Sequence, residues 1–479
     1  MLFNSFQFLY FFIVVTTLYF VLAHKYRAWL LLAASCYFYM VFVPIYILIL
    51  GFTIVIDYFA GILIENAQGH KRKLYLLASI IANVGVLCVF KYYNFFIGNI
   101  NGALHHLNPG SSFAFPFLAI LLPIGLSFHT FQAMSYTIEV YRGNQKAERN
   151  FGIYALYVMF YPQLVAGPIE RPQNMLWQFK TEHYFDYSKT VSGLRLIVWG
   201  IFKKMVIADR LAIYVNDVYN HVHNYAGVSL IIATIFFSIQ IFCDFSGYSD
   251  IAIGCARIMG FTLMKNFDIP YYSKNISEFW RRWHISLSTW FRDYLYFPLG
   301  GNRVSDARVY MNLMIVFMVS GLWHGANWTF VIWGALHGFY LVIWKLTQGI
   351  RKKTSTAIGL NKAPVLSGLL SGGLTFIATA FAWIFFRANT FKDAMYVVTH
   401  MLHSNGKVGI GSMTKLNFYL AIFSIAIMEM VHYQQAKGNH LTLLAKQPTL
   451  VRWGIYSFFI MVIIFLGNFG DEKFIYFQF

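Results

Sequence analysis

Residues 365–386 read VLSGLLSGGLTFIATAFAWIFF, a run without a single charged side chain. A stretch of about 20 apolar residues crosses the hydrocarbon core of a bilayer as one helix. Similar runs fill much of the chain. The clearest are residues 6–23, 46–64, 74–90, 228–242, 328–344, 416–428 and 453–469, with a shorter run at 29–43 and weaker runs, interrupted by Pro, Gly or charge, at 115–128, 151–166, 194–207 and 310–323. We therefore expect an all-α polytopic membrane protein with about eleven transmembrane helices.

The composition excludes most other classes of protein. Hydrophobic residues make up 58% of the 479 residues and charged residues only 12%, too few for the surface of a soluble domain. Lys and Arg outnumber Asp and Glu by 37 to 19, which indicates basic cytoplasmic loops and no nucleic-acid partner. The four cysteines lie singly in apolar runs, and no metal-binding, phosphate-binding or nucleophile-elbow motif occurs. We expect no metal site and no bound cofactor.

The distribution of basic residues predicts the orientation of the chain in the membrane. Lys25, Arg27 and the three basic residues at 71–73 flank alternate connections, whereas the intervening connections contain only Lys91. Basic residues mark the cytoplasmic side, so the N-terminus is expected outside. No linker separates soluble domains, and one transmembrane domain over residues 1–479 is expected.

The densest polar segment, residues 266–303, is rich in aromatic residues. Residues 277–293 read SEFWRRWHISLSTWFRD. We expect Ser277 to cap a helix here and Glu278 to pair with Arg282. One helix would place Trp280, Trp283, His284, Leu287, Trp290, Phe291 and Tyr294 in a single stripe, with Arg281, Ser288 and Arg292 to one side.

Two interpretations of this stripe stay open. An amphipathic helix at the membrane surface would place its indoles among the lipid headgroups. Aromatic rings around arginines also suit a channel for an anionic acyl carrier. His284 favours the second interpretation, because an ionisable ring in an apolar stripe needs a polar partner or a cavity.

A second histidine lies in SGLWHGANW, residues 320–328, between two apolar runs. Glycines on either side of His324 predict a helix break, and an ionisable residue at membrane depth is a functional hypothesis by default. A core histidine bonded to a carbonyl is the alternative, and His337 is interpreted as packing. Asp244 and Asp250 are expected to form ion pairs with basic residues at Lys203, Lys204 or Arg210.

These motifs resemble the signature of the bacterial membrane-bound O-acyltransferases, in particular the branch that acetylates alginate. The resemblance rests on YYSKNISEFWRRWHISLSTWFRDYLYFPLGGNR (271–303), GLWHGAN (321–327), DFSGYSD (244–250), PIGLSF (123–128), QLVAGP (163–168) and FIYFQF (474–479). The core of the family pattern lies at about residues 240–340. Asp268, Ile269 and His129 depart from the pattern.

The resemblance implies a bacterial inner-membrane enzyme whose helices, some of them interfacial or re-entrant, surround a central funnel. It implies that His324 is catalytic and that His284 is the second essential residue. It also implies that a cytoplasmic thioester such as acetyl-CoA donates the acyl group. The group would reach a hydroxyl of an exported polysaccharide with the help of a periplasmic SGNH-type transferase. We expect substrate contacts from Trp283, Ser288, Trp290, Arg292, Trp323 and Asn327.

Other functions are consistent with parts of the sequence. Transfer of D-alanine to teichoic acid would use the same motifs with a carrier protein as donor. A transporter or flippase would use the histidines as a proton relay, but it predicts inverted hydropathy repeats, which we do not find. A scaffold of a secretion complex would leave both histidines replaceable. For the enzyme, we expect neutral His324 to act as a general base, with an acyl-histidine intermediate as the alternative.

Overall fold

The computed structural model describes residues 1–109, 113–119, 123–165, 167–403, 411–438, 444, 446–470 and 474–475. It divides into two compact units. Unit 1 comprises Met1–Ile197 and Ile251–Met264, and unit 2 comprises Val198–Asp250 and Lys265–Phe479. The described residues form helices and their connections and contain no β-strand, which confirms the all-α prediction. One transmembrane domain over residues 1–479 stays a prediction.

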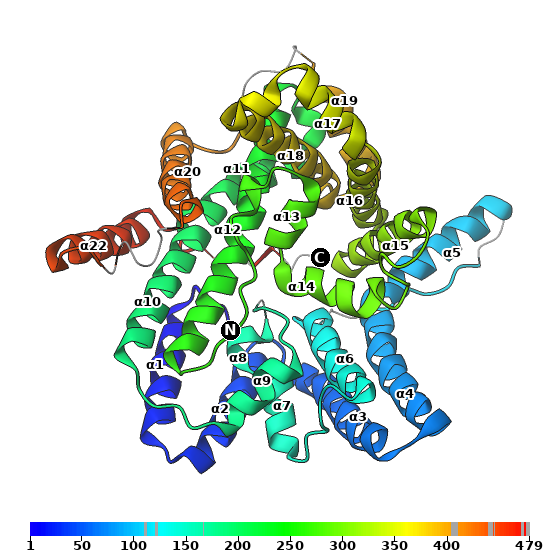
Figure 1. Cartoon of the computed structure of the whole chain (residues 1–479), viewed down its shortest axis with the longest axis vertical. Coiled ribbons are helices and arrows are strands. Elements are labelled where there is room, and N and C mark those ends of the chain that lie inside the picture. Colours follow the sequence, from blue (N-terminus) through cyan, green and yellow to red (C-terminus); the bar gives the residue numbers. More distant parts are fainter. Residues whose placement is uncertain are drawn as a thin grey trace. The chain divides into compact units, whose positions relative to one another are not determined.

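Two helices of unit 1, α1 and α7, begin at residues whose side chains cap them. Ser5 accepts a hydrogen bond from the Phe8 amide at 3.1 Å and starts α1 (Phe6–Val21). Asn150 accepts one from the Ile153 amide at 3.2 Å and starts α7 (Phe151–Met159). Such caps satisfy amides that have no partner within the helix. The other helices of this unit in Figure 1 are α2 (His24–Met40), α3 (Ile47–Asn66), α4 (Gly69–Leu87), α5 (Tyr93–Leu107), α6 (Leu126–Arg142), α8 (Tyr161–Leu164), α9 (Pro172–Lys180) and most of α10 (Tyr187–Ile201).

Unit 2 contains the longest helix, α12 (Val228–Ile258), up to Asp250. Short helices connect its long helices. Two π-helical turns, at Phe202–Ala208 and Arg292–Tyr296, also lie between them. Its remaining α-helices are α11 (Asp209–Asn220), α13 (Ile276–Arg282), α14 (Ile285–Phe291), α15 (Asp306–His324), α16 (Trp328–Leu346), α17 (Gln348–Ala357), α18 (Pro364–Arg387), α19 (Phe391–His400), α20 (Lys415–Ala436) and α22 (Thr449–Leu466).

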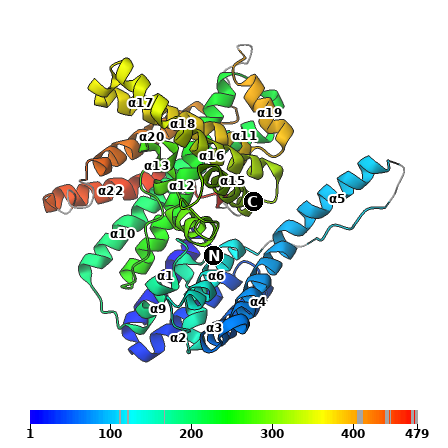
Figure 2. The same cartoon turned by 45° about the vertical axis from the view of Figure 1, so that its right-hand side comes forward.

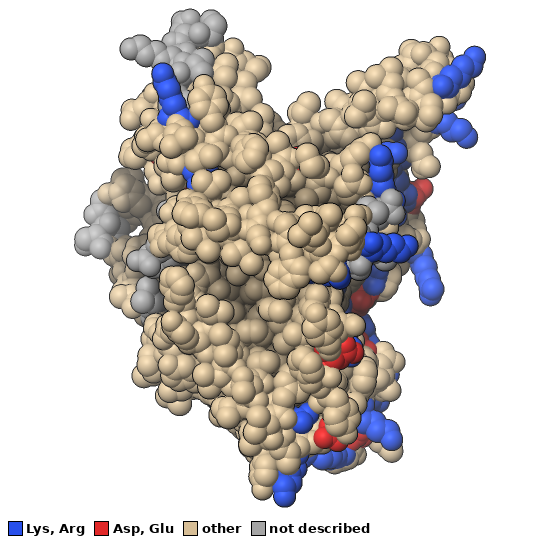
Figure 3. Space-filling view, turned by 90° about the vertical axis from the view of Figure 1, so that its left-hand side faces the viewer, with Lys and Arg blue, Asp and Glu red and all other residues tan. Residues whose placement is uncertain are grey.

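The helices confirm that the protein spans the membrane several times. Among the described residues, 7 helical segments are long and apolar enough to cross a bilayer: Pro44–Asn66, Gly69–Leu107, Val228–Ile258, Trp328–Leu346, Pro364–Arg387, Lys415–Ala436 and Thr449–Leu466. Figure 3 shows a surface on which uncharged side chains predominate, as expected where helices face lipid.

The number of long apolar helices is lower than the about eleven expected, because weaker apolar runs adopt other structures. The run at 151–166 is divided near Pro162 into the short helices α7 and α8, and residue 166 lies outside the described residues. The run at 194–207 passes from α10 into the π-helix Phe202–Ala208.

The predicted span at 115–128 is wrong in its described part. Residues 113–119 are extended beside α5, residues 120–122 lie outside the described residues, and α6 begins only at Leu126. Asn94 and Asn101 of α5 pair with the backbones of Leu118 and Phe115, each donating through Nδ2 and accepting through Oδ1 at 2.8 to 2.9 Å. Two asparagines seven residues apart share one helix face and so bind the extended segment along its length.

The helix that carries these asparagines is unusually long. Residues Gly69–Leu107 are helical for 39 residues through α4, a π-helical turn and α5. At 1.5 Å per residue this helix is roughly 58 Å long, about twice the thickness of a hydrocarbon core. Figure 2 shows α5 extending well beyond α3 and α6 of the same unit.

Buried ion pairs hold the start of α11 against α12 in unit 2. Lys203 Nζ lies 2.6 Å from Asp250, and Lys204 Nζ lies 2.7 Å from both Asp209 and Asp244. The predicted pairing of Asp244 and Asp250 with Lys203 and Lys204 is therefore confirmed, whereas Arg210 donates to Asn417 and Leu466. The amide of Ile475 donates to Asp244 Oδ2 at 2.6 Å, so the described part of the C-terminal tail docks on this cluster.

Two glycines bring α15 and α16 into close contact. A Cβ atom on Gly321 would lie 2.2 Å from the Phe330 carbonyl oxygen, and one on Gly334 would lie 2.1 Å from that of Phe317. Real Cβ atoms do not approach backbone so closely, so this helix pair requires glycine at both positions. The pairing places His324, the last residue of α15, opposite the first turns of α16.

Candidate active site

The histidine of the polar segment lies at a break between two short helices. α13 ends at Arg282, α14 begins at Ile285, and His284 between them has φ 41° and ψ 56°. This left-handed conformation is rare for residues other than glycine and is retained where surrounding contacts determine it. The prediction of one continuous helix through residues 277–293 is therefore wrong, because these contacts outweigh the helical pattern.

Two local predictions for this segment have different outcomes. Asn275, two residues before the expected position, caps α13 by accepting from the Glu278 amide at 2.8 Å, so the prediction of Ser277 as the cap is wrong. The ion pair between Glu278 and Arg282 is confirmed at 2.8 Å. Trp280, Trp283 and Trp290 are at most 9% exposed, which excludes a helix that lays these indoles among lipid headgroups.

Hydrogen bonds determine which nitrogen of His284 carries the proton. Asn266 Oδ1 accepts from the amide and the hydroxyl of Ser286 at 3.3 and 2.9 Å, which identifies this atom as the oxygen. His284 Nδ1 lies 3.1 Å from the same oxygen and must donate to it. Asn266 Nδ2 in turn donates to Ser249 at 3.2 Å. The neutral ring therefore carries its proton on Nδ1 and its lone pair on Nε2.

His284 is fully buried among aromatic rings. Phe245 lies edge-on at 4.6 Å between centroids, and Phe267 stacks at 6.2 Å. Burial lowers the pKa of His284 to about 3, so the ring is neutral near pH 7. A neutral imidazole with an oriented lone pair is suited to accept a proton or a hydrogen bond.

The second histidine ends α15, as the glycine pattern predicts. Gly325 follows His324 in an extended conformation, and α16 begins three residues later, capped by Asn327. The His324 ring is 3% exposed and packs on three aromatic rings. The distances between centroids are 4.9 Å to Trp323, 5.0 Å to Trp333 and 5.4 Å to Phe386.

Trp323 connects the two histidines within unit 2. Its ring lies 6.4 Å from that of His284 and 4.9 Å from that of His324. Two histidines that are 40 residues apart in the sequence thus contact the same indole. The two imidazole rings therefore lie beside one buried aromatic surface. An acyl chain or a thioester bound there would be shielded from water.

The other predicted substrate contacts differ in their surroundings. Trp283 lies between Phe267 and Trp383, at 5.1 Å from each, and so belongs to the same aromatic cluster. Ser288 Oγ donates to the Trp283 carbonyl at 3.2 Å, and Asn327 accepts from the Thr329 amide at 3.0 Å, so both have a local structural role.

Trp290 and Arg292 contact residues other than those around Trp283. Trp290 packs on Phe291 and Tyr294. Arg292 is half-exposed and pairs with Asp293 at 2.8 Å. Their assignment as substrate-binding residues stays a prediction.

Sequence reasoning missed the partner that orients His284. Asn266 is 18 positions away in the chain and lies outside any helix, so no pattern within one element relates the two residues. Its only signal is an amide side chain in an otherwise apolar and aromatic context, close to the position Ile269. Ile269 and His284 are the two non-glycine residues with positive φ in the described structure.

His337 has the surroundings that its interpretation as packing predicts. It is fully buried, accepts a hydrogen bond from Trp280 Nε1 at 3.2 Å, and lies 5.0 Å from the Trp333 ring. The Trp333 ring lies at the same distance, 5.0 Å, from the ring of His324. His337 thus supports the aromatic cluster around His324.

Comparison with known proteins identifies similar enzymes. Residues 145–379 match the model of the MBOAT, membrane-bound O-acyltransferase family. A probable alginate O-acetylase of Pseudomonas aeruginosa is 38% identical over 424 residues, which cover 87% of this chain and 77% of that protein. A peptidoglycan O-acetyltransferase of Helicobacter pylori is 36% identical over 407 residues, 79% of this chain and 74% of that protein. A teichoic acid D-alanyltransferase of Bacillus subtilis is more distant, at 28% identity over 48% of this chain and 60% of that protein.

Proposed function

Because this chain belongs to the membrane-bound O-acyltransferase family, we propose that it transfers an acetyl group from a thioester donor to a hydroxyl of an exported polysaccharide. Acyl transfer is the chemistry of the family, and the relatives with the greater coverage are O-acetylating enzymes. The observation that carries the proposal is the pair of buried histidines in contact with Trp323.

In the proposed mechanism, His324 acts as the general base. Neutral His324 takes the proton of the acceptor hydroxyl as its oxygen attacks the thioester carbonyl, which forms a tetrahedral intermediate. The carbon–sulfur bond then breaks, and the imidazolium returns the proton to the leaving thiolate. The products are an ester and a free thiol, so the proton is conserved. A general base typically contributes roughly 10²–10⁴-fold, and positioning and oxyanion stabilisation supply the remainder.

His284 has a different role in this proposal. With its proton on Nδ1, the neutral ring has no N–H at Nε2 and is a poor oxyanion donor. We assign Nε2 as the acceptor of a hydrogen bond from an N–H or O–H group of a substrate, which orients that substrate beside Trp323. The indole N–H of Trp283 and the backbone near Gly325 are the candidate oxyanion donors.

The donor, the partner and the orientation complete the proposal. The basic residues near 25–27 and 71–73 support a cytoplasmic donor side with the N-terminus outside, in a bacterial inner membrane. A thioester such as acetyl-CoA is the proposed donor. A periplasmic SGNH-type transferase is the proposed partner that passes the acetyl group to the polysaccharide.

D-alanyl transfer to teichoic acid has less support. The D-alanyltransferase shares 28% identity over 48% of this chain, whereas the alginate O-acetylase shares 38% over 87%. The two histidines are compatible with transfer of either acyl group, so the greater identity and coverage of the O-acetylating relatives favour acetyl transfer.

The His324→Ala variant tests the proposal. We expect it to abolish acetylation of the exported polysaccharide while the amount of protein in the membrane is unchanged. The matched control is His106→Ala, which removes an exposed histidine at the end of α5 and should leave acetylation intact. Acetyl esters on isolated polysaccharide are measured in cells that produce each variant. Full acetylation by the His324→Ala variant would contradict the proposed mechanism.

A further inference from the structure

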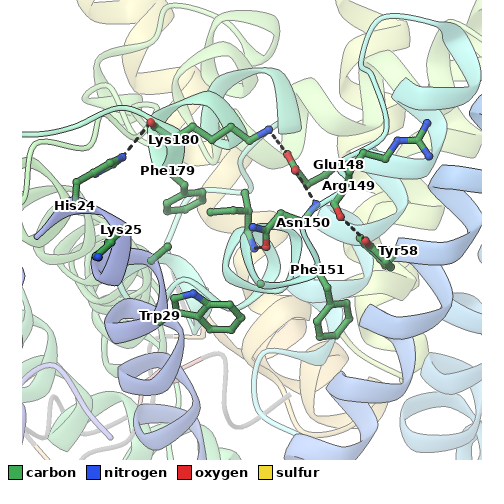
Figure 4. A pocket seen from close by; sticks show the side chains of 13 residues that line it. His24, Lys25, Trp29, Tyr58, Glu148, Arg149, Asn150, Phe151, Phe179 and Lys180 are labelled. Carbon is green, nitrogen blue, oxygen red and sulfur yellow. Dashed lines mark hydrogen bonds and ion pairs between the residues drawn. The ribbon is translucent and has the colours of Figure 1, made fainter.

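Unit 1 contains a cavity whose lining residues include neither histidine of the candidate active site. Its volume is about 860 Å³. Figure 4 shows side chains from the start of α2, the middle of α3, the loop before α7 and the end of α9 around it. The charged and aromatic residues that line it are His24, Lys25, Trp29, Tyr58, Glu148, Arg149, Phe151, Phe179 and Lys180.

Positive charge predominates in the lining of this cavity. Lys25, Arg149 and Lys180 are cationic, and Glu148 is the single carboxylate among the lining residues. Glu148 is 6% exposed and pairs with Lys180 Nζ at 2.6 Å, and Arg149 pairs with Glu65 outside the lining. No carboxylate in the described structure forms an ion pair with Lys25. The cavity therefore has excess positive charge for an anionic group.

Hydrogen bonds connect the segments that form the polar wall of the cavity. Tyr58 donates to the Arg149 carbonyl at 2.6 Å, Glu148 accepts from the Asn150 amide at 3.0 Å, and His24 Nε2 lies 3.2 Å from the Lys180 carbonyl. Together with the ion pair between Lys180 and Glu148, these bonds link α2, α3 and α9 to the loop before α7. Four segments of one unit thus form this wall, as in preformed ligand sites.

The opposite wall is aromatic and open. Trp29 is 59% exposed and Phe151 is 43% exposed, although both border the cavity. Trp29 packs against Gly152, where a Cβ atom would lie 3.0 Å from the indole. Phe151 packs edge-on against Tyr58 at 5.3 Å. A ligand in this cavity thus meets charge on one side and a large exposed apolar surface on the other.

The cavity lies where an apolar helix begins. α2 starts with His24, Lys25, Tyr26 and Arg27 and continues with apolar residues from Ala28 to Met40, apart from single small polar side chains. Basic and aromatic residues at the end of an apolar helix mark the level of lipid headgroups. A ligand at this level is surrounded by phospholipid.

We propose that this cavity binds the phosphate headgroup of an anionic glycerophospholipid, with its acyl chains along Trp29 and Phe151. Lys25 supplies the charge for the phosphate, and the exposed rings supply the apolar surface for the chains. Free inorganic phosphate shares the anionic chemistry but makes no use of the aromatic wall. This inference does not depend on the acyl-transfer reaction.

The experiment uses the full-length protein purified in a neutral detergent. Its thermal unfolding midpoint is measured with phosphatidylglycerol, with phosphatidylcholine or with inorganic phosphate. We expect phosphatidylglycerol to raise the midpoint and the other two ligands to have little effect. Equal shifts with both lipids would contradict charge recognition, and an equal shift with inorganic phosphate would contradict a lipid site.

Two variants locate the site. Lys25→Gln removes a lining cation that has no carboxylate partner and should weaken the apparent affinity for phosphatidylglycerol about fivefold, the effect of one basic residue near an anionic lipid. Lys73→Gln removes an exposed cation of the same unit outside the cavity and should leave the affinity unchanged. Equal affinities of the two variants would overturn the proposal.

Discussion

The two histidines of unit 2 are held in place by different means. His284 has a left-handed backbone and donates to Asn266, so a hydrogen bond and a strained turn orient its ring. His324 ends a regular helix, and the close pairing of α15 with α16 places its ring against Trp323, Trp333 and Phe386. The comparison indicates that a polar side chain orients the ring of His284, whereas helix packing places the ring of His324.

The largest effect expected in this comparison is on the rate of acyl transfer. The His284→Ala variant should lower the rate by roughly 10²-fold, because the hydrogen-bond acceptor that orients the substrate beside Trp323 is lost. A variant with both histidines replaced should be no slower than the slower single variant, since groups that act together are not additive. The rate is measured with labelled donor and full-length protein in membranes. Additive losses would contradict one shared site around Trp323.

Replacing Asn266 tests the polar positioning of His284. The Asn266→Ala variant should lower kcat by roughly 10–100-fold, because loss of a partner that orients a functional histidine has that cost in comparable sites. KM should change less than kcat if the residue acts only through His284. Asn99→Ala, on the exposed part of α5, is the matched control. A normal kcat in the Asn266→Ala variant would mean that the backbone alone orients the ring.

Replacing Gly334 tests the packing that places His324 and has the smallest expected effect. A Cβ atom there would lie 2.1 Å from the Phe317 carbonyl oxygen, so the Gly334→Ala variant should lose roughly 1–3 kcal/mol of stability. Gly349→Ala is the control, because a Cβ at Gly349 in α17 has nothing within 4 Å. The thermal unfolding midpoint of the purified protein measures both. An unchanged midpoint in the Gly334→Ala variant would contradict the close helix pair.

Some features of the site follow from local sequence. The end of α15 at His324 follows from the glycine next to it, and the pair of Glu278 with Arg282 follows from a spacing of four residues. The pairing of Lys203 and Lys204 with Asp250 and Asp244 follows from the cost of leaving a carboxylate unpaired in an apolar environment. Each of these predictions depends on one strong local or electrostatic constraint.

Other features depended on contacts between distant segments. The periodicity of residues 277–293 predicts one continuous helix, but the helix is broken at His284. The Asn266 backbone carbonyl accepts from the Ile285 amide at 2.8 Å, and the Asn266 side chain accepts from His284. The apolar run at 115–128 predicts a helix, but its first part is extended beside α5. The side-chain amides of Asn94 and Asn101 replace the hydrogen bonds that a helix would provide. Neither partner is identifiable from a local pattern.

The sequence by itself determined that this protein is a helical membrane protein, and it predicted His284 and His324 as its candidate catalytic residues. Long apolar runs can satisfy their backbone only as helices in lipid, and the motifs around His284 and His324 resemble one enzyme family. The tertiary structure alone decided that both rings contact Trp323, that His284 carries its proton on Nδ1, and that unit 1 encloses a basic cavity. These properties depend on distances and hydrogen-bond directions between residues far apart in the chain, which a one-dimensional pattern does not contain.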